Sequence, residues 1–149
     1  MTDIASINLW HKRARPEPTD NDFNVQFGCH FEEIAEMMIT LDSADAVTRN
    51  KLSMLAYQIM SLAEGIKRGV YVVDITNRKE FLDAICDQVV TGVGAAYCAK
   101  MDVVKGIGIV NTSNWSKFDE NGQPLRDENG KIKKGPKYTP PHLDECVCS

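Results

Sequence analysis

Apolar residues recur at helical spacing over four stretches of the chain, and polar residues separate the stretches. The first stretch, from residue 27 to about residue 41, places its apolar side chains on one face of a helix. Those side chains are Ile34, Met37, Met38 and Leu41. Three further helices are predicted over about 45–68, from residue 76 or 77 to about 101, and over about 102–116. The pattern predicts an all-α fold with a four-helix core.

Residues with capping preferences mark the ends of these predicted helices. The stretch 42–45 offers N-caps for the second helix, Thr76 or Asn77 caps the third, and Gly69 ends the second. The β-prone residues 70–73 are expected to form a buried linker turn. The third helix is expected to turn one apolar face towards the core. The side chains of that face are Phe81, Leu82, Ile85, Val89, Val93, Ala96 and Tyr97.

The two ends of the chain differ in composition from this core. Pro16 and Pro18 disfavour regular structure, so residues 1–22 are expected to form an irregular arm before a helical catalytic core over 23–116. Residues 117–149 form the third part. There, two Asp-Glu-Asn-Gly tetrads are turn signals and predict a short β-hairpin-like flap, followed by a frayed tail. One domain overall is expected.

Composition and charge narrow the function classes. The chain has 149 residues, 43% hydrophobic and 26% charged, and its apolar runs are too short to span a membrane. The N-terminus lacks the pattern of a secretory signal, so a cytoplasmic location is expected. The net charge of −4 argues against a nucleic-acid partner. Residues 117–137 nevertheless carry a net charge of +2, which leaves −6 on the rest of the chain.

Two of the predicted helices carry an acidic stripe beside an apolar stripe. The first stripe consists of Glu32, Glu33 and Glu36, and the second of Glu80, Asp83 and Asp87. If the apolar faces pack together, these carboxylates converge, and a hard cation such as Mg²⁺ or Mn²⁺ is needed to neutralise them. The alternative is that each stripe is a solvated helix face.

The acidic motifs and their surroundings resemble a known enzyme family. Glu32-Glu33-Ile34-Ala35-Glu36 resembles the EExxE motif of the all-α nucleoside triphosphate pyrophosphohydrolases, the MazG-like group. Asp83-Ala84-Ile85-Cys86-Asp87 looks like the second acidic motif in phage members of that group. Three further segments are similar to the phage subgroup: residues 26–30, which directly precede EExxE, residues 111–117 and residues 127–138. The resemblance covers about residues 7–141.

The resemblance implies a MazG-like four-helix bundle that forms a homo-oligomer, either a dimer or a tetramer. It implies hydrolysis of nucleoside triphosphates at the α–β bond, which yields the monophosphate and pyrophosphate. Mg²⁺ is the implied cofactor, and Mn²⁺ is expected to substitute for it. In a phage-encoded enzyme the location would be the host cytoplasm.

Each site residue takes a role under this resemblance. The implied metal ligands are Glu33, Glu36, Asp83 and Asp87, with Glu80 in reserve because Glu80-Phe81-Leu82-Asp83 is the literal ExxD. Glu32 and Glu33 are the expected catalytic residues, and Glu32 would orient or deprotonate the attacking water. The expected nucleotide- and phosphate-binding residues are Asn111, Asn114, Lys117, Arg126, Lys131 and Lys134.

The resemblance to the phage subgroup implies purine deoxynucleoside triphosphates as substrates, with dGTP first and dATP and broad specificity behind it. The Asn111 and Asn114 amides offer both the donors and the acceptors that a guanine edge needs, but they would equally suit a sugar hydroxyl or a helix end. Such an enzyme would reshape the nucleotide pool of a phage-infected cell. Two other functions stay open: an enzyme like phosphoribosyl-ATP pyrophosphohydrolase, and a non-enzymatic helical adaptor with solvated acidic stripes.

Overall fold

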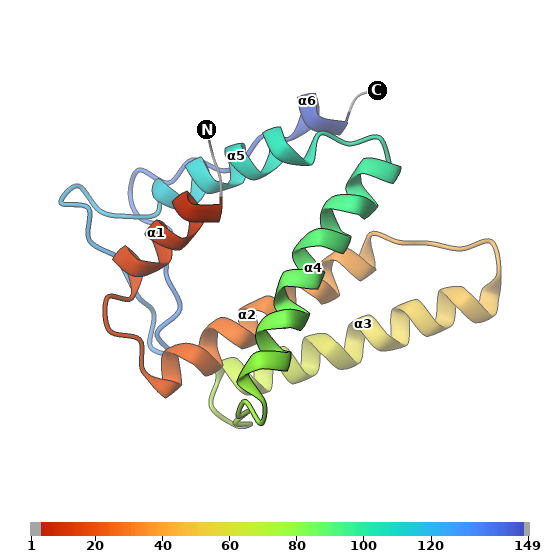
Figure 1. Cartoon of the computed structure of the whole chain (residues 1–149), viewed down its shortest axis with the longest axis horizontal. Coiled ribbons are helices and arrows are strands. Elements are labelled where there is room, and N and C mark those ends of the chain that lie inside the picture. The colour runs from red at the N-terminus through yellow and green to blue at the C-terminus, as the bar shows by residue number, and fades with distance from the viewer. Residues whose placement is uncertain (1–3, 148–149) are drawn as a thin grey trace. The chain divides into compact units, whose positions relative to one another are not determined.

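The computed structural model describes residues 4–147, and all of the regular elements within that range are helices, which agrees with the predicted all-α class (Figure 1). None of these helices is long and apolar enough to cross a membrane. The helices are α1 (Ile4–Ala14), α2 (Asp20–Ile39), α3 (Ala46–Lys67), α4 (Arg78–Cys98), α5 (Val103–Trp115) and α6 (Asp144–Val147).

The chain divides into two compact units, each of which is discontinuous in sequence. Unit 2 consists of residues 17–73 and 126–131, and it contains α2 and α3. Unit 1 contains the remaining helices and is built from residues up to 16, 74–125 and those after 131. The four helices of the predicted core are thus distributed over both units, and the unit boundaries differ from the arm, core and flap expected from sequence.

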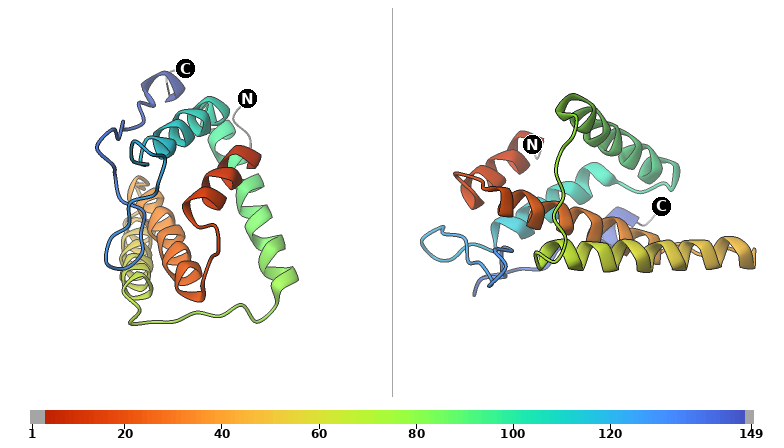
Figure 2. Two further views of the ribbon diagram at one scale, coloured as in Figure 1. Left: turned by 90° about the vertical axis from the view of Figure 1, so that its left-hand side faces the viewer. Right: turned by 90° about the horizontal axis from the view of Figure 1, so that it is seen from below.

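Unit 2 is a helical hairpin in which α2 and α3 lie side by side, as both views of Figure 2 show. Small residues bring the two backbones together. A Cβ atom on Gly28 would lie 2.7 Å from the Lys67 Cγ and 3.0 Å from the Ala63 carbonyl oxygen. Val25 and Ile66 are the largest side chains with full burial, and both belong to this hairpin.

The start of α2 is set by a capping box that the apolar pattern did not indicate. Thr19 is the N-cap, its hydroxyl accepts from the Asp22 amide at 3.2 Å, and Asp22 Oδ2 accepts from the Thr19 amide at 3.1 Å. These reciprocal hydrogen bonds satisfy amides of the first turn. The helix therefore begins at Asp20, seven residues before the predicted start.

The ends of α3 and the start of α4 agree with the predicted caps. Asp45 caps α3, and Asn77 caps α4. At the end of α3, Gly69 has a φ of +69°, while Gly69 N donates to Ile66 O and Val70 N donates to Gly65 O. This pair of hydrogen bonds is a Schellman motif, for which glycine is favoured.

The linker after α3 contradicts the expectation of a buried turn. Val70, Tyr71 and Val72 are all more than half exposed, whereas Val73 is partly buried and its amide donates to Asn24 Oδ1 at 2.9 Å. The backbone polar groups of an irregular segment are most easily satisfied at the surface, which explains the exposed course of the linker.

In unit 1, the expectation of an irregular N-terminal arm is wrong for residues 4–14, which form α1. Both prolines lie beyond the end of this helix, so they do not interrupt it. Trp10 anchors α1, because its ring stacks on Phe118 at 5.7 Å and its Nε1 donates to the Asn114 carbonyl at 2.8 Å. Trp115 meets Phe118 edge-on at 5.5 Å and completes an aromatic core.

The expected inward face of α4 is also wrong, because this helix has no buried residue. Leu82, Val89, Val93 and Tyr97 are exposed, and Phe81, Ile85 and Ala96 are only partly covered. The helix ends at Cys98, three residues before the predicted end, with Lys100 at a φ of +60°. Glycine is the residue that usually adopts this left-handed conformation after a helix. Because a lysine adopts it here, the sequence contains no glycine that would mark the end of α4.

The flap follows α5 in the chain and contains the two predicted turns. In each tetrad the aspartate carboxylate accepts from the amides two and four residues later, and the glycine has a positive φ of 70° or 87°. The turns are at 119–122 and 127–130. Lys133 N also donates to Leu125 O at 2.7 Å, in the manner of a hairpin.

The expectation of a frayed tail is wrong for its described part, which forms the short helix α6. Cys146 is buried, and its carbonyl accepts from the Asp102 amide at 2.8 Å. Lys105 forms an ion pair with Glu145. These contacts attach α6 to the N-terminal turn of α5. Cys148 lies outside the described residues.

We predict that Asp22 stabilises the protein in a pH-dependent manner. Burial alone would raise the pKa of the Asp22 carboxyl, but hydrogen bonds from Thr19 and the hydrogen bond and charge of Arg126 lower it to about 2. An unfolded aspartate titrates near 4, so this stabilisation is complete above pH ~4 and is lost as the pH falls towards 2.

Asp22→Asn is therefore expected to lower the free energy of unfolding by about 2 kcal/mol at pH 7, and by much less at pH 2–3. Urea unfolding followed by circular dichroism at several pH values measures this difference. Asp20→Asn, a substitution of an exposed first-turn aspartate, is the matched control. A difference between wild type and Asp22→Asn that does not change with pH would contradict the assignment.

Candidate functional site

The first glutamate of the acidic motif on α2 is held by two lysines within unit 2. Glu32 Oε1 accepts from Lys67 Nζ at 2.7 Å, and Glu32 Oε2 accepts from Lys131 Nζ at 2.9 Å. Lys67 ends α3, whereas Lys131 follows the 127–130 turn. The Glu32 carboxylate thus joins three segments that are distant in sequence.

This ion-pair cluster is partly shielded from water. The side chains of Lys67 and Glu32 are 11% and 20% exposed, whereas that of Lys131 is 43% exposed. Burial alone would raise the pKa of Glu32, but the hydrogen bonds and charges of Lys67 and Lys131 outweigh it and lower the pKa. Glu32 is therefore a carboxylate at neutral pH, and a weak proton acceptor.

The other two glutamates of the motif face solvent. Glu33 and Glu36 are exposed, and their spacing of three residues puts them about one turn apart on α2. Carboxylate oxygens are the donors that Mg²⁺ and Mn²⁺ prefer, so this pair suits a hard cation. Across the described residues, no group of three or more His, Cys, Asp or Glu side chains has the proximity of a complete metal site.

The second acidic motif lies on α4, in unit 1. Glu80, Asp83 and Asp87 are all exposed and follow one side of this helix. Glu80 is in the first helical turn, where its amide donates to the Asn77 side chain at 3.3 Å. The two acidic motifs therefore belong to different units, one on each.

The four basic residues expected to bind phosphates all have partners of their own. In unit 2, Arg126 pairs with Asp22 at 2.8 Å, and Lys131 with Glu32. In unit 1, Lys117 Nζ lies 6.0 Å from the Trp10 ring centroid, and Lys134 Nζ lies 4.7 Å from that of Tyr138. Of the four, Lys131 is the one that the structure brings next to the acidic motif of α2.

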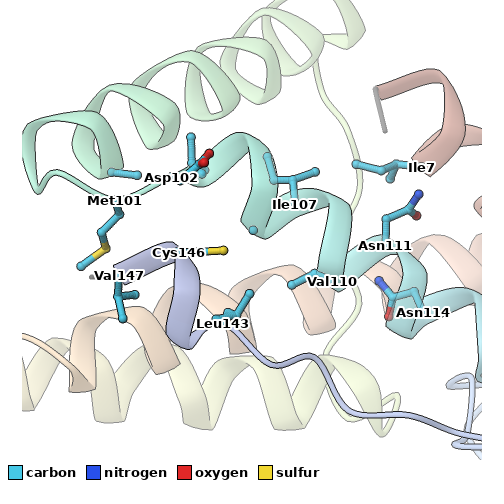
Figure 3. Close-up of a pocket in the computed structure, with 13 residues that line it drawn as sticks. Ile7, Met101, Asp102, Ile107, Val110, Asn111, Asn114, Leu143, Cys146 and Val147 are labelled. Carbon is cyan, nitrogen blue, oxygen red and sulfur yellow. The ribbon is translucent and has the colours of Figure 1, made fainter. Parts of the chain in front are cut away.

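The two asparagines expected to bind the nucleotide line the same pocket of unit 1 (Figure 3). Asn111 is 5% exposed, and its Nδ2 donates to the Ser6 hydroxyl at 2.9 Å. Asn114 lies one turn further along α5. The pocket has a volume of ≈370 Å³ and extends along α5 to α6.

Sequence reasoning missed Lys67 as a residue of this site. Its only sequence signal is the Glu64–Lys67 spacing at the end of a helix, which is common on solvated helices. In the structure Lys67 forms ion pairs with both Glu64, at 3.0 Å, and Glu32. The contact with Glu32 depends on the pairing of α2 with α3, which no local pattern reports.

In comparisons with known proteins, no family model matches the chain, and neither a curated protein nor a solved structure matches it.

We predict that the Lys67–Glu32 pair contributes more to stability than the exposed Lys105–Glu145 pair. Lys67→Met keeps most of the aliphatic stem that packs over Gly28, but it removes a charged hydrogen bond from a partly buried carboxylate. A loss of about 2 kcal/mol in the free energy of unfolding is expected.

Lys105→Met is the matched control, since Glu145 is 80% exposed and surface ion pairs contribute little. Urea unfolding of both variants measures the comparison. Equal losses in the two variants would contradict the assignment of Lys67 as the structural partner of Glu32.

Proposed function

We propose that this protein is a metal-dependent nucleoside triphosphate pyrophosphohydrolase, which cleaves the α–β bond and releases the monophosphate and pyrophosphate. One observation carries the proposal: α2 presents two exposed carboxylates directly beside a carboxylate that holds two lysines. A metal–triphosphate complex needs anionic ligands for its cation and ammonium groups for its phosphates. Both kinds of group occur here around residues 32–36 of one helix.

The residues of the chain take distinct roles in this proposal. Glu33 and Glu36 would hold Mg²⁺ or Mn²⁺, and Asp83 and Asp87 would complete the ligand set proposed from the sequence, with Glu80 in reserve. A bound Mg²⁺ would neutralise phosphate charge and lower the pKa of water. Glu32 orients rather than deprotonates the attacking water, because its ion pairs favour the charged carboxylate. Lys131, which donates to Glu32 beside the two exposed glutamates, would contact the phosphates.

Positioning and electrostatics suffice for attack on phosphorus, so a side-chain nucleophile is not required. The proposed substrates are purine deoxynucleoside triphosphates, with dGTP favoured. Asn111 and Asn114 support this choice, since a carboxamide both donates and accepts hydrogen bonds, as the edge of guanine does. A cytoplasmic enzyme of this kind would reshape the deoxynucleotide pool.

We also propose that the protein is a homo-oligomer, either a dimer or a tetramer, in which apolar helix faces complete a four-helix bundle. The support is the surface of α4. Leu82 and Val90 on this helix are 63% and 69% exposed, and Tyr97 is 79% exposed. A run of exposed apolar side chains along one helix is typical of a protein–protein interface.

The metal site is tested by neutral substitutions at its two glutamates. Glu33→Gln and Glu36→Gln are each expected to lower pyrophosphate release by at least about 10²-fold and to abolish the rise in melting temperature that Mn²⁺ plus nucleotide produces. Glu17→Gln, a substitution at an exposed acid outside the motif, should retain both. Glu80→Gln and Asp87→Asn, measured in parallel, identify which acid completes the second motif.

The same assay tests the substrate when dGTP, dATP, dCTP and dTTP compete at equal concentrations and each monophosphate is quantified. Preferential formation of dGMP is expected. Preferential dCMP or dTMP formation would exclude the purine assignment. Absence of pyrophosphate release, together with a melting temperature unaffected by Mn²⁺ and nucleotide, would instead favour a helical adaptor.

The oligomer is tested by a charged substitution on α4. Val90→Lys is expected to reduce the molar mass measured by light scattering at micromolar concentration, because it places a charge on the proposed apolar interface. Gln88→Lys, on a polar position of the same helix, should leave the mass unchanged. A wild-type protein that is monomeric in this measurement would contradict the proposal.

A further inference from the structure

The pocket of unit 1 has the size and the walls of a small-molecule site. Its volume of ≈370 Å³ falls within the range of ligand pockets, at the lower end. Ile107 and Val110 of α5 form one wall, and Leu143, Cys146 and Val147 from the C-terminal segment form another (Figure 3). These walls are apolar, so the pocket suits a ligand with a flat or hydrophobic body.

Two carboxamides line this apolar pocket. Asn111 Nδ2 donates to Ser6, but its Oδ1 accepts no hydrogen bond from any residue that the structure describes. Likewise, the side-chain carboxamide of Asn114 forms no hydrogen bond within residues 4–147. Neither carboxamide is among the buried side-chain polar atoms of the described residues that lack a partner, so these groups reach water, which the donors and acceptors of a ligand in the pocket would replace.

The charge of the pocket excludes phosphate as its occupant. Neither lysine nor arginine lines it, and its one charged residue is Asp102. The Asp102 carboxylate accepts from the Lys105 amide as the N-cap of α5. A phosphate would therefore meet a carboxylate and apolar walls, whereas an uncharged heteroaromatic ring would meet apolar walls and two carboxamides.

We infer that this pocket binds the purine base of the nucleotide, and that the C-terminal segment 143–147 forms the apolar wall against which the base packs. The inference deepens the proposed function and rests on it for the identity of the nucleotide. It assigns a role to Leu143, Cys146 and Val147, because they form the wall that faces α5 across the pocket.

A second protein chain is a less suitable occupant than a base. An apolar helix pressed against this pocket would cover both carboxamides without offering them donors or acceptors. The edge of a purine offers both, and its ring faces match the apolar walls. The small volume also admits a base with its sugar more readily than a row of protein side chains.

The test uses 2′-deoxyguanosine, which carries no phosphate, as the probe in isothermal titration calorimetry with the full chain. Asn114→Leu keeps a similar side-chain size and removes the carboxamide, so binding should weaken about tenfold. Cys146→Phe fills the pocket and should abolish binding. Asn8→Leu, at an exposed asparagine of α1, is the matched control and should bind as wild type does.

Unchanged binding of deoxyguanosine in Asn114→Leu and Cys146→Phe would overturn the inference, as would absence of binding in wild type. If Cys146→Phe does not fold, Asn114→Leu decides alone. Pyrophosphate release from dGTP is measured beside it. If the protein hydrolyses dGTP but the pocket variants bind deoxyguanosine as wild type does, the base pocket alone is refuted. If the pocket variants bind deoxyguanosine more weakly but the protein does not hydrolyse dGTP, the enzymatic function alone is refuted.

Discussion

Unit 2 depends on the two hydrogen bonds that the Glu32 carboxylate accepts. One comes from Lys67 at the end of α3 and the other from Lys131 after the 127–130 turn, so the carboxylate connects the hairpin to a segment far along the chain. Removing either lysine leaves a partly buried charge with less compensation. The proposed metal-binding pair, Glu33 and Glu36, follows directly on the same helix. The folding of unit 2 and the charge of the candidate site thus share one side chain.

Local sequence predicted most of the helical structure because helix ends and tight turns are determined within a few residues. Asp45 and Asn77 cap α3 and α4 with their own side chains, and Gly69 adopts the left-handed conformation that ends α3. Each of the two Asp-Glu-Asn-Gly tetrads forms its turn with hydrogen bonds to its own aspartate, in two different units. Such contacts need no tertiary information.

Contacts between distant segments could not be read in this way. The role of Lys67 depends on the pairing of α2 with α3, and the pocket depends on the docking of α6 beside Asp102. The apolar face of α4 was expected to point inward but is exposed, for the same reason: periodicity reports which residues share a face and not what covers them. The acidic motifs were visible in the sequence, but their assignment to separate units was not.

Because unit 2 is built from two separate segments of the chain, its contacts become available in a fixed order during synthesis. Lys67 follows Glu32 by 35 residues, so the hairpin and its first ion pair can form early. Lys131 and Arg126 emerge only after the chain of α4 and α5, and at 5–20 residues per second the 58 residues from Val73 to Lys131 take roughly 3–12 s. Through that interval Asp22 and Glu32 each lack one cationic partner. The hairpin of α2 and α3 therefore exists first with these two carboxylates incompletely paired, and Arg126 and Lys131 complete their ion pairs only when the flap has been made.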